Sequence, residues 1–224
     1  MGTWETIDAA GTPARQYVAG AETRGMPGVV LLHAWWGLDP DVTAYADRLA
    51  AAGFAVAAPD LVAGKVATTV EQAEELSAGA DTAMADAAAL AAVDGLAARL
   101  GPDARLGSIG FSFGAAWSIW CAAERGRIAA SVVYYGTVLG GSLARASAPV
   151  LGHFAASDPY ETEEGVAAFE AALRAAGREV TIHRYPDTGH WFAEPSRDAY
   201  RPEPAELAFT RTVDFLENNL GSTG

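Results

Sequence analysis

One serine lies in a strand–turn–helix pattern that limits the fold of this chain more than any other stretch does. Residues 110–114 read Gly-Phe-Ser-Phe-Gly; they follow the apolar run 106–109 and precede 115–124, which has no proline or glycine and suits a buried helix. The two glycines lack Cβ atoms, so the strand end and the helix start can approach closely. The hydroxyl of Ser112 would then project from the carboxyl end of a buried strand, as a nucleophile requires. An ordinary glycine-rich turn is the alternative, because the chain has 24 glycines.

Along most of the chain, short apolar runs typical of strands alternate with stretches whose apolar residues have helical spacing. Strands buried in a sheet are expected at 29–33, 54–58, 106–109, 131–135, 150–154 and 180–185. Helices are expected from Asp41 to Gly53, at 81–100, 115–124 and 162–176, and over the last stretch, where Phe209, Val213, Leu216 and Leu220 share a face. This alternation is typical of the α/β class, with a mostly parallel central sheet and helices on both faces.

Three stretches depart from the alternation. Residues 3–20 alternate weakly and predict an edge hairpin, 137–148 predict a loop, and 61–79 predict an irregular segment with a polar helix at 70–77. The chain shows no internal repeat and no linker long enough to divide it, and 224 residues fit one larger α/β domain. We therefore expect a single domain over residues 1–224.

Composition narrows the range of partners. The chain has 15 Lys and Arg against 28 Asp and Glu, and this net charge of −13 argues against nucleic acid and anionic membranes, because both are polyanions. The sequence contains neither an apolar run of membrane-spanning length nor a signal-peptide pattern. The single cysteine, Cys121, lies in an apolar helix and suits an inert core thiol in a reducing compartment. We expect a cytoplasmic monomer or weak homodimer.

A serine hydroxyl is a poor nucleophile at neutral pH and needs an adjacent base. His190 lies in the loop directly after the last expected strand, at the sheet edge where such proteins bind their ligands. The other histidines lie in strand runs and are expected to be structural: His33, His153 and His183. Asp158 follows the strand at 150–154 and is the favoured partner of His190, which gives the chain order Ser, Asp, His. Asp187 is the alternative, although it lies in a turn where aspartate has a structural use.

An acyl-transfer site also needs two backbone donors for the oxyanion. The amide of Phe113, at the start of a helix, is one candidate, and the amide of Trp35, in the loop after the strand at 29–33, is the other. Trp36, Tyr135 and Trp191 follow strands at the same edge and are expected to line an aromatic substrate pocket. Core packing is the alternative for the two adjacent tryptophans. No metal ligands are expected.

These stretches together resemble the dienelactone hydrolase family of α/β-hydrolases. The resemblance covers nearly the whole chain and rests on the Asp158 loop and on 34–38 (Ala-Trp-Trp-Gly-Leu), 58–61 (Ala-Pro-Asp-Leu), 110–114, 133–136 (Val-Tyr-Tyr-Gly) and 189–192 (Gly-His-Trp-Phe). It implies a single-domain α/β-hydrolase fold. It also implies an enzyme that opens enol-lactones or cleaves esters without a cofactor.

Three positions depart from the enzymes that give the family its name. Those enzymes carry cysteine where this chain has Ser112, and a glutamate that partners the resting thiol where this chain has Ala34. A serine does not need that glutamate, so the two changes are consistent. They also carry a substrate-binding arginine where this chain has Glu194, which would repel a substrate carboxylate. Lys65 could replace the lost cation.

We therefore expect a serine hydrolase that cleaves a small-molecule carboxylic ester or lactone through a Ser-His-Asp triad and an acyl-enzyme. One alternative is a true dienelactone hydrolase that binds anionic lactones with Lys65 or Arg197. Another is a catalytically silent protein of the same fold that only binds a ligand or partner. The acyl and alcohol preference depends on 61–79 and 137–148, which the sequence pattern describes least.

Overall fold

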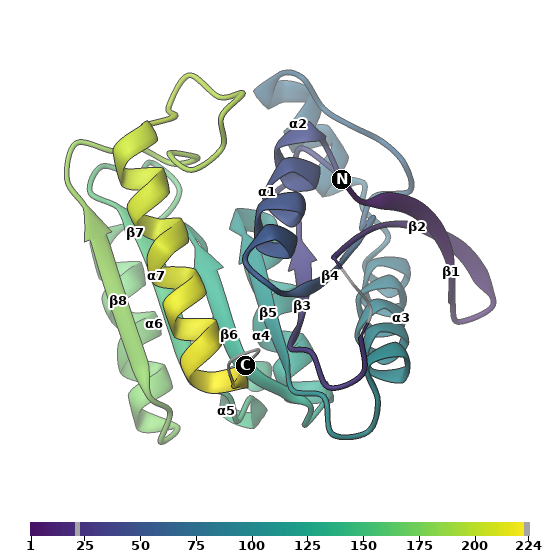
Figure 1. Cartoon of the computed structure of the whole chain (residues 1–224). Helices are drawn as coiled ribbons and strands as arrows, with labels where there is room; N and C mark the ends of the chain where they lie inside the picture. Colours follow the sequence, from purple (N-terminus) through teal and green to yellow (C-terminus); the bar gives the residue numbers. More distant parts are fainter. Residues whose placement is uncertain (21–22, 222–224) are drawn as a thin grey trace.

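A computed structural model describes residues 1–20 and 23–221, which form one eight-stranded sheet with the order β1-β2-β4-β3-β5-β6-β7-β8 (Figure 1). The strands are β1 (Thr3–Ala9), β2 (Thr12–Ala19), β3 (Gly28–Leu32), β4 (Ala55–Pro59), β5 (Leu106–Phe111), β6 (Ile128–Tyr134), β7 (Val150–Ala155) and β8 (Val180–Tyr185). The hairpin of β1 and β2 pairs antiparallel at one edge, and the strands from β4 to β8 pair in parallel. The expected α/β class, the mostly parallel sheet and the edge hairpin are confirmed.

Helices cover both faces of this sheet. They are α1 (Pro40–Ala51), α2 (Val70–Ala78), α3 (Thr82–Leu100), α4 (Ala115–Glu124), α5 (Gly141–Arg145), α6 (Glu163–Ala175) and α7 (Pro202–Leu220). In Figure 1, α1 and α7 lie in front of the sheet, and α3, α4 and α6 lie behind it. Because successive strand residues point to opposite faces, β3 contributes Leu31 to the core beneath α1 and α7, and Val30 and Leu32 to the core beneath α3 and α4.

Two local predictions are wrong. Asp39, not Asp41, caps α1, and its Oδ1 accepts from the amides of Asp41 (3.0 Å) and Val42 (3.2 Å). Pro40 is the first residue of this helix, where its fixed φ fits, so the residue before it is the cap. The expected loop at 137–148 contains the short helix α5.

The buried face of α7 also differs in part from the expected one. Leu216 and Leu220 are buried as expected, but Phe209 and Val213 are only partly buried and pack at the margin of the core. Ala205, Ala208 and Thr212 complete the buried face, and the hydroxyl of Thr212 hydrogen-bonds to Tyr134 inside the core at 2.8 Å.

The parallel strands all end at one edge of the sheet, at the top of Figure 1, where the segments 33–39, 60–69, 112–114, 135–140, 156–161 and 186–201 follow them. Residues far apart in sequence therefore meet at this edge, as the strand order requires. Within the described ranges, no helix combines the length and the apolar character that crossing a membrane requires.

Candidate active site

Ser112 lies on a strained turn directly after β5. Its φ is +47°, in the left-handed region that residues with side chains rarely adopt. The glycines on either side allow close packing: a Cβ on Gly110 would lie 2.3 Å from the carbonyl oxygen of Gly114, and a Cβ on Gly114 would lie 2.4 Å from that of Leu32. Only glycine fits at these two positions, which is the role that the sequence predicts for them.

Ser112, His190 and Asp158 form a continuous hydrogen-bonded chain. Ser112 Oγ lies 2.9 Å from His190 Nε2, and His190 Nδ1 lies 2.7 Å from Asp158 Oδ2. The other carboxylate oxygen, Oδ1, accepts from the amides of Tyr160 (2.9 Å) and Glu161 (3.1 Å). Asp158 is therefore fixed by its own loop and orients the imidazole, the arrangement that general-base activation of a serine needs.

The structure separates these residues from the alternatives that the sequence left open. Asp187 is exposed in a turn, with φ +57°, and the hydrogen-bond partner of His190 Nδ1 is Asp158 instead. His33 is buried; its Nε2 accepts from the amide of Leu61 at 3.0 Å, and burial lowers its pKa. His153 and His183 lie in β7 and β8.

The two predicted oxyanion donors come from segments that touch. A Cβ on Gly114 would also lie 2.7 Å from the carbonyl oxygen of His33, so the turn at 112–114 packs directly on the end of β3. This contact brings the Phe113 amide beside the loop that starts at Ala34. Outside helices and strands, the Trp35 amide donates to no backbone carbonyl of the described residues. The role of both amides stays a prediction.

A cluster of aromatic rings lies beside the imidazole of His190. Trp35, Trp36 and Trp191 contact one another, with ring centroids 5.1–5.8 Å apart. Tyr160 joins them, at 5.4 Å from Trp35, 5.3 Å from Trp191 and 4.9 Å from His190. Sequence reasoning missed Tyr160, and the only signal for it was an aromatic residue two positions after Asp158. Whether Trp36 and Trp191 contact a substrate stays a prediction.

Tyr135 and Glu194 form a buried pair on another side of His190. The ring of Tyr135 is fully buried and lies 4.9 Å from that of His190, and its hydroxyl donates to Glu194 Oε1 at 2.8 Å. Burial raises the pKa of Glu194 to about 8, although the bond from Tyr135 and the charge of Arg197 favour the ionised form. The Glu194 carboxyl is therefore neutral near pH 7. A protonated Glu194 would not repel a substrate carboxylate, so the predicted repulsion applies only where the carboxyl is ionised; sequence alone shows neither its burial nor its raised pKa.

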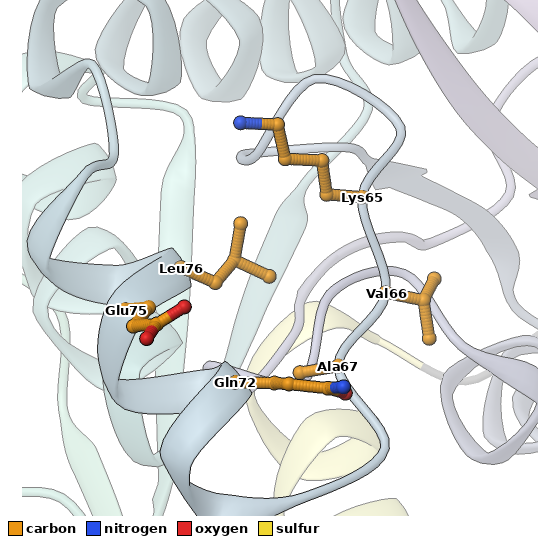
Figure 2. A pocket seen from close by; sticks show the side chains of 6 residues that line it. All are labelled: Lys65, Val66, Ala67, Gln72, Glu75 and Leu76. Carbon is orange, nitrogen blue, oxygen red and sulfur yellow. The ribbon is translucent and has the colours of Figure 1, made fainter.

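Two cations were candidates for binding a substrate carboxylate. Arg197 already donates to Asp39 Oδ2 at 2.5 Å, and its guanidinium lies 3.9 Å from the centroid of the Trp36 ring. Lys65 is exposed in an open pocket of about 430 Å³, where Figure 2 shows its side chain reaching over Leu76 of α2, with Glu75 beside it. Asp39 therefore competes with any substrate carboxylate for the charge of Arg197.

Two further kinds of site, a reactive thiol and a metal centre, were considered. Cys121 is buried, and burial raises its pKa to about 12, so the thiol is inert at neutral pH. In the part of the chain that the structure describes, no three His, Cys, Asp or Glu side chains are grouped to hold a metal ion.

A serine on a strained turn, with a hydrogen-bonded histidine and aspartate at the carboxyl edge of a mostly parallel sheet, defines the α/β-hydrolase class. The sequence model described as "Dienelactone hydrolase family" matches residues 14–220, and the chain belongs to this family. It is therefore a hydrolase that acts on esters or lactones.

Two relatives and one solved structure are similar to this chain over nearly its whole length. A Bradyrhizobium sp. protein named "Probable 2-oxo-3-(5-oxofuran-2-ylidene)propanoate lactonase" is 28% identical over 235 residues, covering 97% of this chain and 94% of that protein. "Protein usf" of Aquifex pyrophilus is 29% identical over 231 residues, covering 98% and 100%. The crystal structure of a dienelactone hydrolase from Anabaena variabilis shares the fold, with a TM-score of 0.72 at 18% identity and 98% coverage of each chain.

Proposed function

We propose that this hydrolase cleaves a carboxylic ester or lactone through a Ser112–His190–Asp158 triad and an acyl-enzyme. The observation that carries this proposal is the unbroken hydrogen bonding from Ser112 Oγ, through both nitrogens of His190, to Asp158 Oδ2. A hydroxyl, an imidazole and a carboxylate in this order can activate the serine and hold the proton that it loses.

Acylation begins when Ser112 Oγ attacks the substrate carbonyl and its proton passes to His190 Nε2. Asp158 stabilises the imidazolium through the Nδ1–H bond and keeps its own negative charge. The carbonyl oxygen becomes an oxyanion, to which the amides of Trp35 and Phe113 would donate. Collapse of the tetrahedral intermediate breaks the ester bond, and the leaving alkoxide takes the proton from His190 Nε2. The acyl group remains on Ser112.

Deacylation repeats these steps with water. His190 Nε2 takes a proton from a water molecule, the hydroxide attacks the acyl carbonyl, and the same amides would hold the second oxyanion. Ser112 Oγ leaves as the proton returns to it from His190, which releases a carboxylic acid and restores the resting site. For a lactone, the alcohol and the acid are parts of one product.

An anionic lactone is the second candidate substrate. The printed name of the Bradyrhizobium relative favours it, because that lactonase is named for a propanoate. In this chain, Lys65 or Arg197 would have to bind the carboxylate, and Arg197 is paired with Asp39. Comparing kcat/KM for a neutral ester and for an acidic dienelactone separates the two: a higher value for the dienelactone would favour the second candidate.

A fluorophosphonate probe tests the proposed nucleophile. We expect the wild-type protein to be labelled on Ser112 and to lose its esterase activity in proportion. Ser112→Ala should not be labelled, and should lose about 10⁴- to 10⁶-fold in kcat while its circular dichroism stays unchanged. Full activity in Ser112→Ala would contradict the triad. No labelling and no hydrolysis in the wild-type protein would indicate a silent binding protein.

A further inference from the structure

Tyr160 covers the outer side of the catalytic imidazole. Its ring lies 4.9 Å from that of His190, and it also contacts Trp35 at 5.4 Å and Trp191 at 5.3 Å. The other tyrosine against His190, Tyr135, is fully buried, whereas Tyr160 is 46% exposed. Of these two tyrosines, Tyr160 is therefore the one whose ring a bound molecule can reach from solvent.

The chemistry of the proposed mechanism fixes which part of a substrate comes here. The leaving oxygen takes its proton from His190 Nε2, so it must come within hydrogen-bond distance of that nitrogen. The group attached to this oxygen then lies beside the rings that pack on the imidazole. The acyl carbon, in contrast, is bound to Ser112 Oγ and points toward the donor amides. Rings around His190 therefore act on the alcohol side of the ester.

The backbone holds Tyr160 in this position. Its amide donates to Asp158 Oδ1 at 2.9 Å, so the residue is tied to the same carboxylate that orients His190. Its ring meets that of Trp35 nearly edge-on, at an interplanar angle of 79°. One face of a preorganised ring binds a flat partner at little cost in conformational entropy.

Negative charge surrounds this position. Burial, and next the negative charges of Glu74 on α2 and of Asp158, raise the pKa of Tyr160, so the phenol is neutral at neutral pH. Arg197, whose guanidinium lies over the ring of Trp36, is paired with Asp39. An anionic group would meet repulsion here, whereas an uncharged ring would not.

We propose that Tyr160, with Trp35 and Trp191, forms the leaving-group subsite and selects uncharged esters whose alcohol carries an aromatic ring. This inference rests on the proposed function, because it assigns the alcohol side from the path of the proton. Aromatic pairs of this kind are worth about a two- to ten-fold preference over a saturated ring of the same size.

Two acetates test the subsite: benzyl acetate and cyclohexylmethyl acetate. They share the acyl group and the type of alcohol, and they differ in the aromaticity of one ring. We expect the wild-type kcat/KM to be about two- to ten-fold higher for the benzyl ester. Tyr160→Phe keeps the ring and should keep this ratio, whereas Tyr160→Leu should lower it, with Trp35 and Trp191 supplying the preference that remains. Both esters give the same acetyl-enzyme, so within each variant they share one deacylation rate and the ratio reports on acylation alone.

A control variant separates recognition from general damage. Trp4 is 47% exposed, like Tyr160, but lies in β1 at one edge of the sheet, whereas the loop of Tyr160 follows β7 near the other edge (Figure 1). Trp4→Leu should leave the ratio of the two esters unchanged. An unchanged ratio in Tyr160→Leu would overturn the proposed subsite, even if kcat/KM fell by the same factor for both esters. A wild-type protein that neither hydrolyses the esters nor reacts with fluorophosphonate would instead overturn the proposed function.

Discussion

His190 and His153 make nearly the same hydrogen bonds in two regions of the molecule. His190 Nε2 lies 2.9 Å from the hydroxyl of Ser112, and its Nδ1 lies 2.7 Å from Asp158. His153 Nε2 lies 3.0 Å from the hydroxyl of Thr212, and its Nδ1 lies 2.7 Å from the phenol of Tyr185. Bond lengths alone therefore do not distinguish the proposed active site from the network beneath α7.

Charge and access distinguish them. The hydrogen-bond network of His190 ends in the carboxylate of Asp158, which can stabilise an imidazolium. The network of His153 ends in the phenol of Tyr185, which is neutral at neutral pH. Thr212 is fully buried in α7, whereas Ser112 is partly exposed on a strained turn at the edge of the sheet. A hydroxyl bonded to an imidazole becomes a nucleophile only where a carboxylate and an approach for substrate are added.

The largest expected effect comes from removing the carboxylate charge of Asp158, which distinguishes the hydrogen-bond network of His190 from that of His153. Asp158→Asn should lower kcat by about 10⁴-fold, because an amide neither stabilises the imidazolium nor keeps the required tautomer. Tyr185→Phe removes the corresponding partner of His153 and should change kcat only a few-fold. Steady-state kinetics on one ester measures both. Similar losses in the two variants would mean that the networks act together.

The proposed mechanism needs a charged carboxylate at Asp158, whereas burial raises the pKa of a second carboxyl, Glu194. The variant Glu194→Gln tests whether Glu194 is protonated in the folded protein. Its folded pKa of about 8 exceeds the ordinary 4.5, so the folded state keeps a proton that the unfolded state loses. The free energy of unfolding should therefore fall as pH rises between these values. At about 1.4 kcal/mol per pKa unit, Glu194→Gln should be more stable than wild type by about 3–5 kcal/mol near pH 9, and similar to it near pH 5.

Urea denaturation at both pH values measures this difference. The charged groups that face Glu194 are Asp39, Asp41 and Arg197, and they are the same in both proteins. A wild-type stability that does not fall with pH relative to Glu194→Gln would show that the carboxyl is ionised in the folded protein.

A smaller effect, on stability, is expected from removing the hydroxyl of Thr212 in the buried network of His153. Thr212→Val keeps the shape of the side chain but removes the oxygen that bonds to both Tyr134 and His153. The unpaired groups should lower the free energy of unfolding by about 1–3 kcal/mol, with kcat unchanged. Ser112→Ala should show the converse, with activity lost and stability nearly kept. Equal losses of stability in the two variants would remove this distinction.

The smallest effect is a pH dependence that belongs to His153. Burial lowers its pKa well below the ordinary 6.5, so the folded state stays unprotonated while the unfolded state binds a proton. Its contribution to stability is present above that ordinary value and is lost as pH falls. The wild-type free energy of unfolding should therefore fall below about pH 6.5 more steeply than that of His153→Phe, by up to about 1.4 kcal/mol per pH unit. Parallel slopes would show that His153 titrates in the folded state.

The residues of the proposed triad could be identified because each directly follows an apolar strand run. A buried parallel strand is a local pattern, and the residue after it must lie at the carboxyl edge. Asp187 also follows a strand, and Asp158 was preferred because Asp187 lies in a turn where aspartate has a structural use; the structure places the Asp158 carboxylate 2.7 Å from His190. The same local logic located nearly all the strands and helices.

The surroundings of these residues could not be predicted, because they depend on contacts between distant segments. Glu194 is buried against Tyr135, which follows a strand 59 residues earlier in the chain. Arg197 pairs with Asp39, 158 residues earlier. Neither pair leaves a periodic signal in the sequence, so a buried acid looked like a repelling surface charge. The cap of α1 is different: Pro40 was a usable local signal that the cap lies at Asp39.

The ring cluster beside His190 has a practical consequence. Trp35, Trp36 and Trp191 are half of the six tryptophans in the chain; they contact one another, and Trp191 also contacts the ring of His190. Indole emission depends on what lies next to the ring, so a molecule that enters this site changes the light emitted by half of the fluorophores. The protein thus carries its own optical reporter, and the arrival of an unlabelled ester and the departure of its products can be followed without dye.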